Sequence, residues 1–271
     1  MDIPTPNLTG TLRQVRQAQR LSQLELSLRL GVSQRHVSFV ESGRAKPSRE
    51  LLMAWLQELD APLVVRNEVM LQAGYAPVYS SARLDDPSLA QVNHALQQLL
   101  CAHDPMPALV IDEHWNLLRL NRGGQWLAAT LMPGAADLGS ATPANILDLL
   151  VHPEGLAKSI VNLPEVGPTL LSHLRHEAVA QPALTPRVDA FAALLHRRLG
   201  PHSLATSWSR PTAPVLTTRY ATHYGELAFF SMFTTFGTPQ DITLASLRVE
   251  HLFAANEATH AVLRAQVQGA E

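Results

Sequence analysis

Four polar side chains near residue 35 have the types and the spacing that suit the reading of DNA bases. They are Ser33, Gln34, Arg35 and Ser38. A glutamine amide can form two hydrogen bonds with N6 and N7 of adenine, and an arginine guanidinium can form two with O6 and N7 of guanine. Each such pair discriminates against a wrong base by about 1–3 kcal/mol. A helix beginning at Ser33 would carry these side chains on its first turns, where they could enter a major groove.

The surrounding residues predict that helix and a partner for it. Ser22 and Glu25 have the spacing of a capping box, so a helix is expected to begin there. Gly31 is a natural C-terminal glycine for this helix, and Ser33 is the N-cap of the next, which should run to about residue 42. The positions expected to be buried are all apolar: Leu26, Leu30, Val32, Val37 and Val40. Two short capped helices joined by a glycine turn have the spacing of a helix-turn-helix.

Three further helices are expected around this pair. The first starts near Thr9, the fourth is capped by Ser48, and the fifth runs from about Leu63 to Ala73. Residues 1–75 therefore predict an all-α bundle of five helices. Residues 76–88 are rich in proline, serine and aspartate and form the best candidate for a linker.

Residues 89–271 have an α+β pattern. A helix over 89–101 precedes two short apolar runs within 107–121, which predict a hairpin. Residues 122–200 are expected to be mostly helical, and residues 215–253 predict three strands with turns at 223–226 and 237–241. The expected breaks within the helical part are the segment near 133–143 and the prolines Pro153, Pro164, Pro168, Pro182 and Pro186.

Length and composition set the frame for these elements. The chain has 271 residues, of which 46% are hydrophobic and 16% charged, so two domains with buried cores are expected. Residues 1–75 hold nine basic and seven acidic residues, and the rest holds 12 basic and 16 acidic ones. This modest asymmetry is compatible with a DNA-reading head on an acidic body. The single cysteine, Cys101, excludes an internal disulfide and is expected to be a small buried residue.

Targeting and membrane signals are not apparent in the sequence. No apolar run is long enough to span a bilayer, and the first residues do not form a signal peptide. A cytoplasmic protein without a membrane partner is therefore expected.

The segment "LRQVRQAQRLSQLELSLRLGVSQRHVSFVESGRAKPS" resembles the phage-repressor-type (XRE/Cro) helix-turn-helix family, and the likeness covers residues 8–74. It implies that Arg16 and Glu41 form a buried structural ion pair. It also implies that the loop at Arg44 and Lys46 touches phosphate. Phe39 stands where some members have a polar base-contacting residue, so it either touches a thymine methyl or packs. The residues expected to contact DNA are Gln23, Ser33, Gln34, Arg35, Ser38, Phe39, Arg44 and Lys46.

Motifs of catalysis or metal binding are not found. There is no GxSxG, Walker or GxGxxG motif, and a Ser–Lys self-cleaving repressor would depend on Lys158. His173 and His176 are three residues apart on an expected helix but lack the HExxH arrangement. No catalytic residue, metal or cofactor is therefore expected. The alternative to a regulator is an enzyme or a protein-docking adaptor with a helical head and no operator.

The apolar stretch "ELAFFSMF" predicts either a doubly covered central strand or a strand that lines a pocket. Its bulky side chains fall on both faces, with Phe229 and Phe233 on one and Phe230 on the other. A pocket for an apolar ligand needs few polar groups, for which Arg219 and Tyr220 are candidates. The full set of candidate ligand-binding residues is Trp115, Asn121, Trp126, Met132, Arg219, Tyr220, His223, Phe229, Phe230 and Phe233, and Trp208 adds a further bulky side chain.

The blocks "PALVIDEHWNLLRLNRGGQWL", "NILDLLVHPEG", "LLSHLRHEA" and "HYGELAFF" are similar to the MmyB-like ligand-binding domain that follows this type of helix-turn-helix in bacterial regulators. The resemblance implies a PAS-like fold with a five-stranded antiparallel sheet, and a small apolar ligand with fatty acids as the precedent. It also implies a strand over 115–121 and a helix that begins at Asn121. The family's proline after His223 is absent here, so ligand placement at that turn is not carried over.

Together these patterns predict a homodimeric regulator that binds double-stranded DNA. Its recognition helices would read a palindromic operator one DNA turn apart, at about 34 Å. The C-terminal domain would respond to the small apolar ligand.

Overall fold

The computed structural model describes residues 7–133, 144–200 and 215–268. The chain divides into two compact units, each considered by itself. The first holds the residues up to Arg83 together with Thr238–Ala245, and the second holds Leu84–Gly237 and the residues from Ser246 onward. Among the described residues, no helix is both long enough and apolar enough to cross a membrane.

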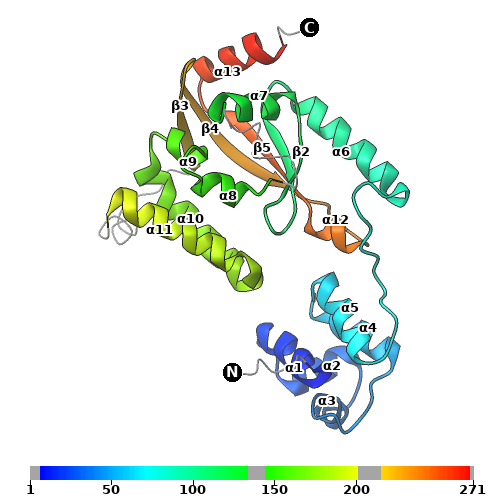
Figure 1. Cartoon of the computed structure of the whole chain (residues 1–271). Helices are drawn as coiled ribbons and strands as arrows, with labels where there is room; N and C mark the ends of the chain where they lie inside the picture. Colours follow the sequence, from blue (N-terminus) through cyan, green and yellow to red (C-terminus); the bar gives the residue numbers. More distant parts are fainter. Residues whose placement is uncertain (1–6, 134–143, 201–214, 269–271) are drawn as a thin grey trace. The chain divides into compact units, whose positions relative to one another are not determined.

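Five helices form the first unit, as the sequence predicted (Figure 1): α1 (Leu8–Ala18), α2 (Gln23–Leu30), α3 (Gln34–Glu41), α4 (Arg49–Glu58) and α5 (Leu63–Gln72). Each helix contributes an apolar stripe to one core. The buried side chains include Leu12, Leu26, Val37, Trp55 and Met70.

Local signals set the ends of α2 and α3. The Ser22 hydroxyl accepts from the Glu25 amide while the Glu25 carboxylate accepts from the Ser22 amide, so the predicted capping box is confirmed. Gly31 ends α2 with a φ of 65°, a left-handed conformation that favours glycine. The Ser33 hydroxyl accepts from the amide of His36 and starts α3. The turn between the two helices is therefore encoded by neighbouring residues.

The segment after α5 is held by side chains distant in sequence. The Asn67 carboxamide binds the backbone of Val78 and Tyr79. The buried carboxylate of Asp241 then accepts from the Ser80 hydroxyl and the Ala82 amide. Asp241 also precedes the short helix α12 (Ile242–Ser246), where the sequence had predicted that the third strand would follow the turn at 237–241.

The second unit contains the predicted five-stranded antiparallel sheet. Its strands are β1 (Ala108–Ile111), β2 (Leu117–Leu120), β3 (Thr217–Thr222), β4 (Gly225–Thr234) and β5 (Arg248–Ala254). They lie in the order β2-β1-β5-β4-β3, which places β5 at the centre. The hairpin expected within 107–121 and the three strands expected within 215–253 are all present.

Helices flank this sheet (Figure 1). They are α6 (Ala90–His103), α7 (Arg122–Leu131), α8 (Ile146–Val151), α9 (Leu156–Ser159), α10 (Leu163–Ala180), α11 (Thr185–Leu199) and α13 (Glu257–Leu263). Short 3₁₀ turns cover Pro87–Leu89 and Pro182–Leu184, and a π-helical turn covers Arg264–Gln268. The α10–α11 pair packs with α8 around buried apolar side chains that include Leu147, Leu174, Phe191 and Leu195.

Three expectations need correction. The strand implied over 115–121 begins only at Leu117, because Trp115 occupies a turn with a φ of 65°. Pro168 does not break a helix but lies inside α10, where it forgoes one backbone hydrogen bond. Cys101 is exposed on α6, where its sulfur accepts from the Gln97 amide. Most of the break expected near 133–143 lies outside the described residues.

Candidate DNA interface and ligand cavity

The first turn of α3 presents polar side chains while its inner face is fixed in the core. Ser33, Gln34 and Arg35 are exposed, and Val37 and Val40 are buried. A helix that is anchored on one side and polar at its N-terminus can enter a major groove without rearrangement. The structure thus brings three of the predicted DNA-contacting residues to one exposed turn.

Phe39 lies between two arginines. The Arg35 guanidinium lies 5.1 Å from the centre of the Phe39 ring, and that of Arg44 lies 5.9 Å from it. Both distances are in the range of a cation–π contact. The half-buried ring therefore supports the two guanidinium groups, one on α3 and one in the loop that follows it. Sequence reasoning missed this arrangement because it considered Phe39 only as a base contact or a packing residue.

The remaining basic and polar candidates continue the same stretch. Lys46 is exposed, and its ammonium lies 5.6 Å from the centre of the Tyr75 ring. Tyr75 in turn donates its hydroxyl proton to the carbonyl of Pro47. Ser38 is half-buried on α3. The contacts of all these residues with DNA stay predictions.

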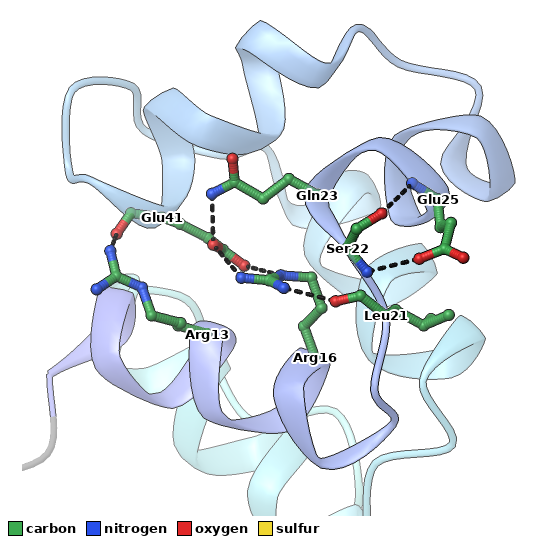
Figure 2. A network of polar contacts seen from close by, with 7 residues as sticks. All are labelled: Arg13, Arg16, Leu21, Ser22, Gln23, Glu25 and Glu41. Atoms are coloured by element: carbon green, nitrogen blue, oxygen red, sulfur yellow. Dashed lines mark hydrogen bonds and ion pairs between the residues drawn. The ribbon is translucent and has the colours of Figure 1, made fainter.

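A buried ion pair ties α3 to α1 and confirms the expected pairing of Arg16 with Glu41 (Figure 2). The Arg16 guanidinium donates to both carboxylate oxygens of Glu41, at 2.7 and 2.9 Å, and to the Leu21 carbonyl at 2.6 Å. Burial alone would raise the pKa of Glu41, but the hydrogen bonds from Arg16 and Gln23 outweigh it and lower the pKa. The same pairing raises the pKa of Arg16.

Gln23 takes part in this network as well. Its amide nitrogen lies 2.8 Å from a Glu41 carboxylate oxygen (Figure 2). Since Gln23 is the first residue of α2, the contact links α2 to the end of α3. The DNA contact predicted for Gln23 would have to be made by a side chain whose amide group already has a partner.

The second unit encloses a cavity of about 750 Å³ between one face of the sheet and helices α7 to α10. Its described walls are mainly apolar side chains, among which leucine is the most frequent. Five predicted ligand-binding residues line it: Trp115, Met132, Tyr220, Phe229 and Phe233. The stretch "ELAFFSMF" therefore lines a pocket with one of its faces, the second of the two interpretations of its pattern.

Three other candidates have structural partners away from the cavity. Asn121 is the N-cap of α7, as the resemblance implied, and its carboxamide oxygen also accepts from the Ala108 amide. Arg219 forms an exposed ion pair with Glu226 at 3.3 Å. Phe230 lies on the opposite face of the sheet, stacked on Phe253 with ring centres 5.4 Å apart.

The last two described candidates both lie next to Tyr224, in the β3–β4 turn. The Trp126 ring lies 5.4 Å from that of Tyr224, and the His223 ring lies 3.9 Å from it. Neither Trp126 nor His223 is among the described residues that line the cavity. Trp208 lies outside the described residues.

A cluster of polar and aromatic side chains at the cavity wall fixes Trp115. The Trp115 indole nitrogen donates to one carboxylate oxygen of Glu177, at 2.9 Å. The Arg248 guanidinium donates to the other oxygen at 2.8 Å and lies 5.0 Å from the centre of the Trp115 ring. The three side chains connect the β1–β2 turn, α10 and β5.

Apart from Tyr220, the polar residues that line the cavity were not predicted from the sequence. Ser231, His173, His176 and Glu250 all line it. Burial raises the pKa of Glu250, and burial together with the charge of Glu250 raises the pKa of Tyr220. The sequence offered no signal for Glu250, because its position at the sheet centre depends on the strand order.

Both the helical N-terminal part and the α+β part of the chain match known protein families. A family profile described as "MmyB-like transcription regulator ligand binding domain" matches residues 92–265, and one described as "Helix-turn-helix" matches residues 12–65. The "Uncharacterized HTH-type transcriptional regulator y4dL" of Sinorhizobium fredii (strain NBRC 101917 / NGR234) is 36% identical over 73 residues. That alignment covers 27% of this chain and 37% of the relative.

One solved structure was also matched. The "Structure of an RNA-binding Light-Oxygen-Voltage Receptor" aligns with 97% of this chain and 63% of its own, at 14% identity and a TM-score of 0.27. A TM-score this low does not show a shared fold.

Proposed function

The chain belongs to the family of MmyB-like transcription regulators, with a helix-turn-helix ahead of the ligand-binding domain, and from this we propose how it works. As a DNA-binding regulator it acts as a cytoplasmic homodimer that reads a palindromic operator through α3. Its second unit holds a small apolar ligand, with a fatty-acid chain as the class expected. Ligand occupancy changes the affinity for the operator.

The exposed first turn of α3 carries the DNA-reading part of this proposal. Gln34 and Arg35 are exposed on a helix that the Arg16–Glu41 pair and the Ser33 cap hold in place. A rigid helix supports specific reading because little freedom of the protein is lost on binding. In a homodimer, two such helices about 34 Å apart would meet successive major grooves.

The cavity carries the ligand-binding part. Its volume of about 750 Å³ falls within the range of roughly 300–1,000 Å³ that is usual for small-molecule sites. Its apolar walls, including Met132 and Phe229, would cover a hydrocarbon chain. Burial of such a chain contributes about 0.8 kcal/mol per methylene group.

Two experiments test these parts. Footprinting of the full chain on the DNA that flanks its own gene should protect two half-sites one helical turn apart. Uniform, salt-sensitive protection without half-sites would leave only nonspecific binding. Native mass spectrometry of the purified chain should show a co-purified or added lipid, and a chain that takes up no apolar ligand would contradict the ligand-binding part.

A further inference from the structure

The cavity contains a carboxyl group at the centre of a sheet face that is otherwise mainly apolar. Glu250 belongs to the central strand β5 and lines the cavity. Its cross-strand partners are Leu109 on β1 and Phe233 on β4, both of which also line the cavity. An acidic side chain at such a position is costly unless it stays neutral or finds a partner.

Two hydroxyl groups line the same cavity. The Ser231 hydroxyl is one of them, and by favouring the Glu250 carboxylate it opposes part of the rise in the pKa of Glu250. The Tyr220 hydroxyl comes from the edge strand β3, and its pKa is raised by burial and by the nearby Glu250 charge. Each raised pKa favours the uncharged form of its group, which can donate a hydrogen bond.

The charged groups around Glu250 already have partners. Arg248 stands two residues before it on β5, and its guanidinium donates to Glu177 on α10 at 2.8 Å. No lysine or arginine is found among the described residues that line the cavity. The lining histidines, His173 and His176, are exposed on α10, and His173 lies 3.9 Å from Glu177. The cation whose charge acts on Glu250 is thus Arg248, which already pairs with Glu177 and does not line the cavity, so an anionic ligand group beside Glu250 would compete with Glu177 for it.

We propose that the cavity selects amphiphiles whose buried polar end is an uncharged hydrogen-bond acceptor, such as the carbonyl of an ester or an amide. The acceptor would receive hydrogen bonds from the Tyr220 hydroxyl and the Glu250 carboxyl, while the chain lies against the apolar walls. A carboxylate in the same place would be desolvated and would compete with Glu177 for Arg248, so the free fatty-acid anion is the poorer ligand. This inference rests on the proposed ligand-binding function and specifies the head group.

Three probes with the same chain length separate the head groups. They are methyl dodecanoate, dodecanoate and dodecyltrimethylammonium, each kept below the concentration at which it aggregates and titrated into the full chain by native mass spectrometry. At pH 7.5 the ester should bind at least about tenfold more tightly than either charged probe. This comparison uses the wild-type chain and does not depend on a variant that folds.

Two substitutions locate the effect. Glu250→Gln keeps a hydrogen-bond donor and should retain ester binding within about threefold, whereas Glu250→Leu should lose at least about tenfold. Glu226→Gln is the matched control, since Glu226 is an exposed carboxylate on β4 that pairs with Arg219 and does not line the cavity. It should leave all three affinities unchanged.

The outcomes are distinct. Equal or tighter binding of dodecanoate overturns the head-group inference but leaves a ligand-binding protein. Tight binding of the ammonium probe that Glu250→Gln abolishes would show instead that the carboxyl recognises cations. If none of the three probes binds, the proposed ligand-binding function itself fails.

Discussion

At the residue scale, Glu41 and Glu250 show two solutions to the same problem. Glu41 is buried and Glu250 is half-buried, and in both the loss of water around the carboxyl group acts to raise its pKa. For Glu41, the hydrogen bonds from Arg16 and Gln23 reverse that effect, so the group is held as a carboxylate. For Glu250, the opposing effects of Ser231 and Arg248 are weaker than that of burial, so its pKa is raised. One carboxyl group therefore stabilises the fold, and the other lines the cavity.

The Arg16–Glu41 pair should be important for stability. Replacing Arg16 by alanine leaves a buried carboxylate without its cation, which costs about 3–5 kcal/mol in the free energy of unfolding. Arg29→Ala is the control, because the Arg29–Glu58 pair is largely exposed and should contribute less than about 1 kcal/mol. Urea unfolding followed by circular dichroism measures both variants. Similar losses for the two variants would contradict the importance of burial.

The same pair predicts a pH dependence. The folded-state pKa of Glu41 is lowered, so its stabilising contribution is present above the unfolded pKa and is lost as the pH falls through the lowered value. The stability gap between wild type and Arg16→Ala should therefore narrow in acid. A gap that stays constant down to pH 3 would mean that Glu41 is not the group involved.

Glu250 should behave in the opposite way. Its folded-state pKa is raised, so the stability it confers is fully present below its unfolded pKa of about 4.3 and is lost as the pH rises through the higher folded value. Glu250→Gln should remove this loss, so the melting temperature of the variant should fall less than that of the wild type as the pH rises above the unfolded pKa. The neighbouring groups are unchanged in the variant, namely Arg248, Glu177, Tyr220, His173 and His176, so the difference between the two curves isolates Glu250. Parallel curves would refute the raised pKa.

At the element scale, some features of the chain follow from local sequence signals, and others depend on contacts between residues that are distant in sequence. The ends of α2 and α3 follow from Ser22, Gly31 and Ser33, which act within one turn of chain, so the sequence could predict them. The apolar runs and turns also predicted the strands, and the family resemblance implied that they form a five-stranded antiparallel sheet. The position of Glu250 at the sheet centre could not be predicted, because it depends on pairing with Leu109 and Phe233, residues distant in sequence.

The helix α12 illustrates the same limit. Residues 237–241 were predicted as a turn, since glycine and proline are common there. The segment is fixed by Asp241, whose carboxylate accepts hydrogen bonds from Ser80 and Ala82, which lie 161 and 159 residues earlier in the sequence. The amides of Thr243 and Leu244 also donate to Asp241 and start the helix. A single sequence does not show such a contact.

Asp241 can be tested directly. Asp241→Ala leaves several donors without their acceptor, a loss of about 1–3 kcal/mol. Amide hydrogen exchange should speed up at Ala82, Thr243 and Leu244 and should not change at α3. Asp86→Ala is the control, since Asp86 only caps an exposed turn through Ser88. Unchanged protection at Ala82 would contradict the contact.

At the scale of the whole molecule, the proposed regulation is a coupling of two binding equilibria. If methyl dodecanoate changes operator affinity by some factor, then operator DNA must change the affinity for methyl dodecanoate by the same factor. Measuring both affinities on the full chain checks this reciprocity. A ligand that binds without any change in operator affinity would show that the cavity does not regulate DNA binding.

The most direct test of the account is the substitution Arg35→Ala, measured on operator and on random DNA at one salt concentration. We predict that operator binding weakens by about 1–3 kcal/mol while binding to random DNA barely changes, because Arg35 reads a base edge. Arg29→Ala, on a neighbouring helix and already paired with Glu58, should leave the ratio of the two affinities unchanged. Equal losses on operator and random DNA for Arg35→Ala would contradict the claim that the first turn of α3 reads sequence.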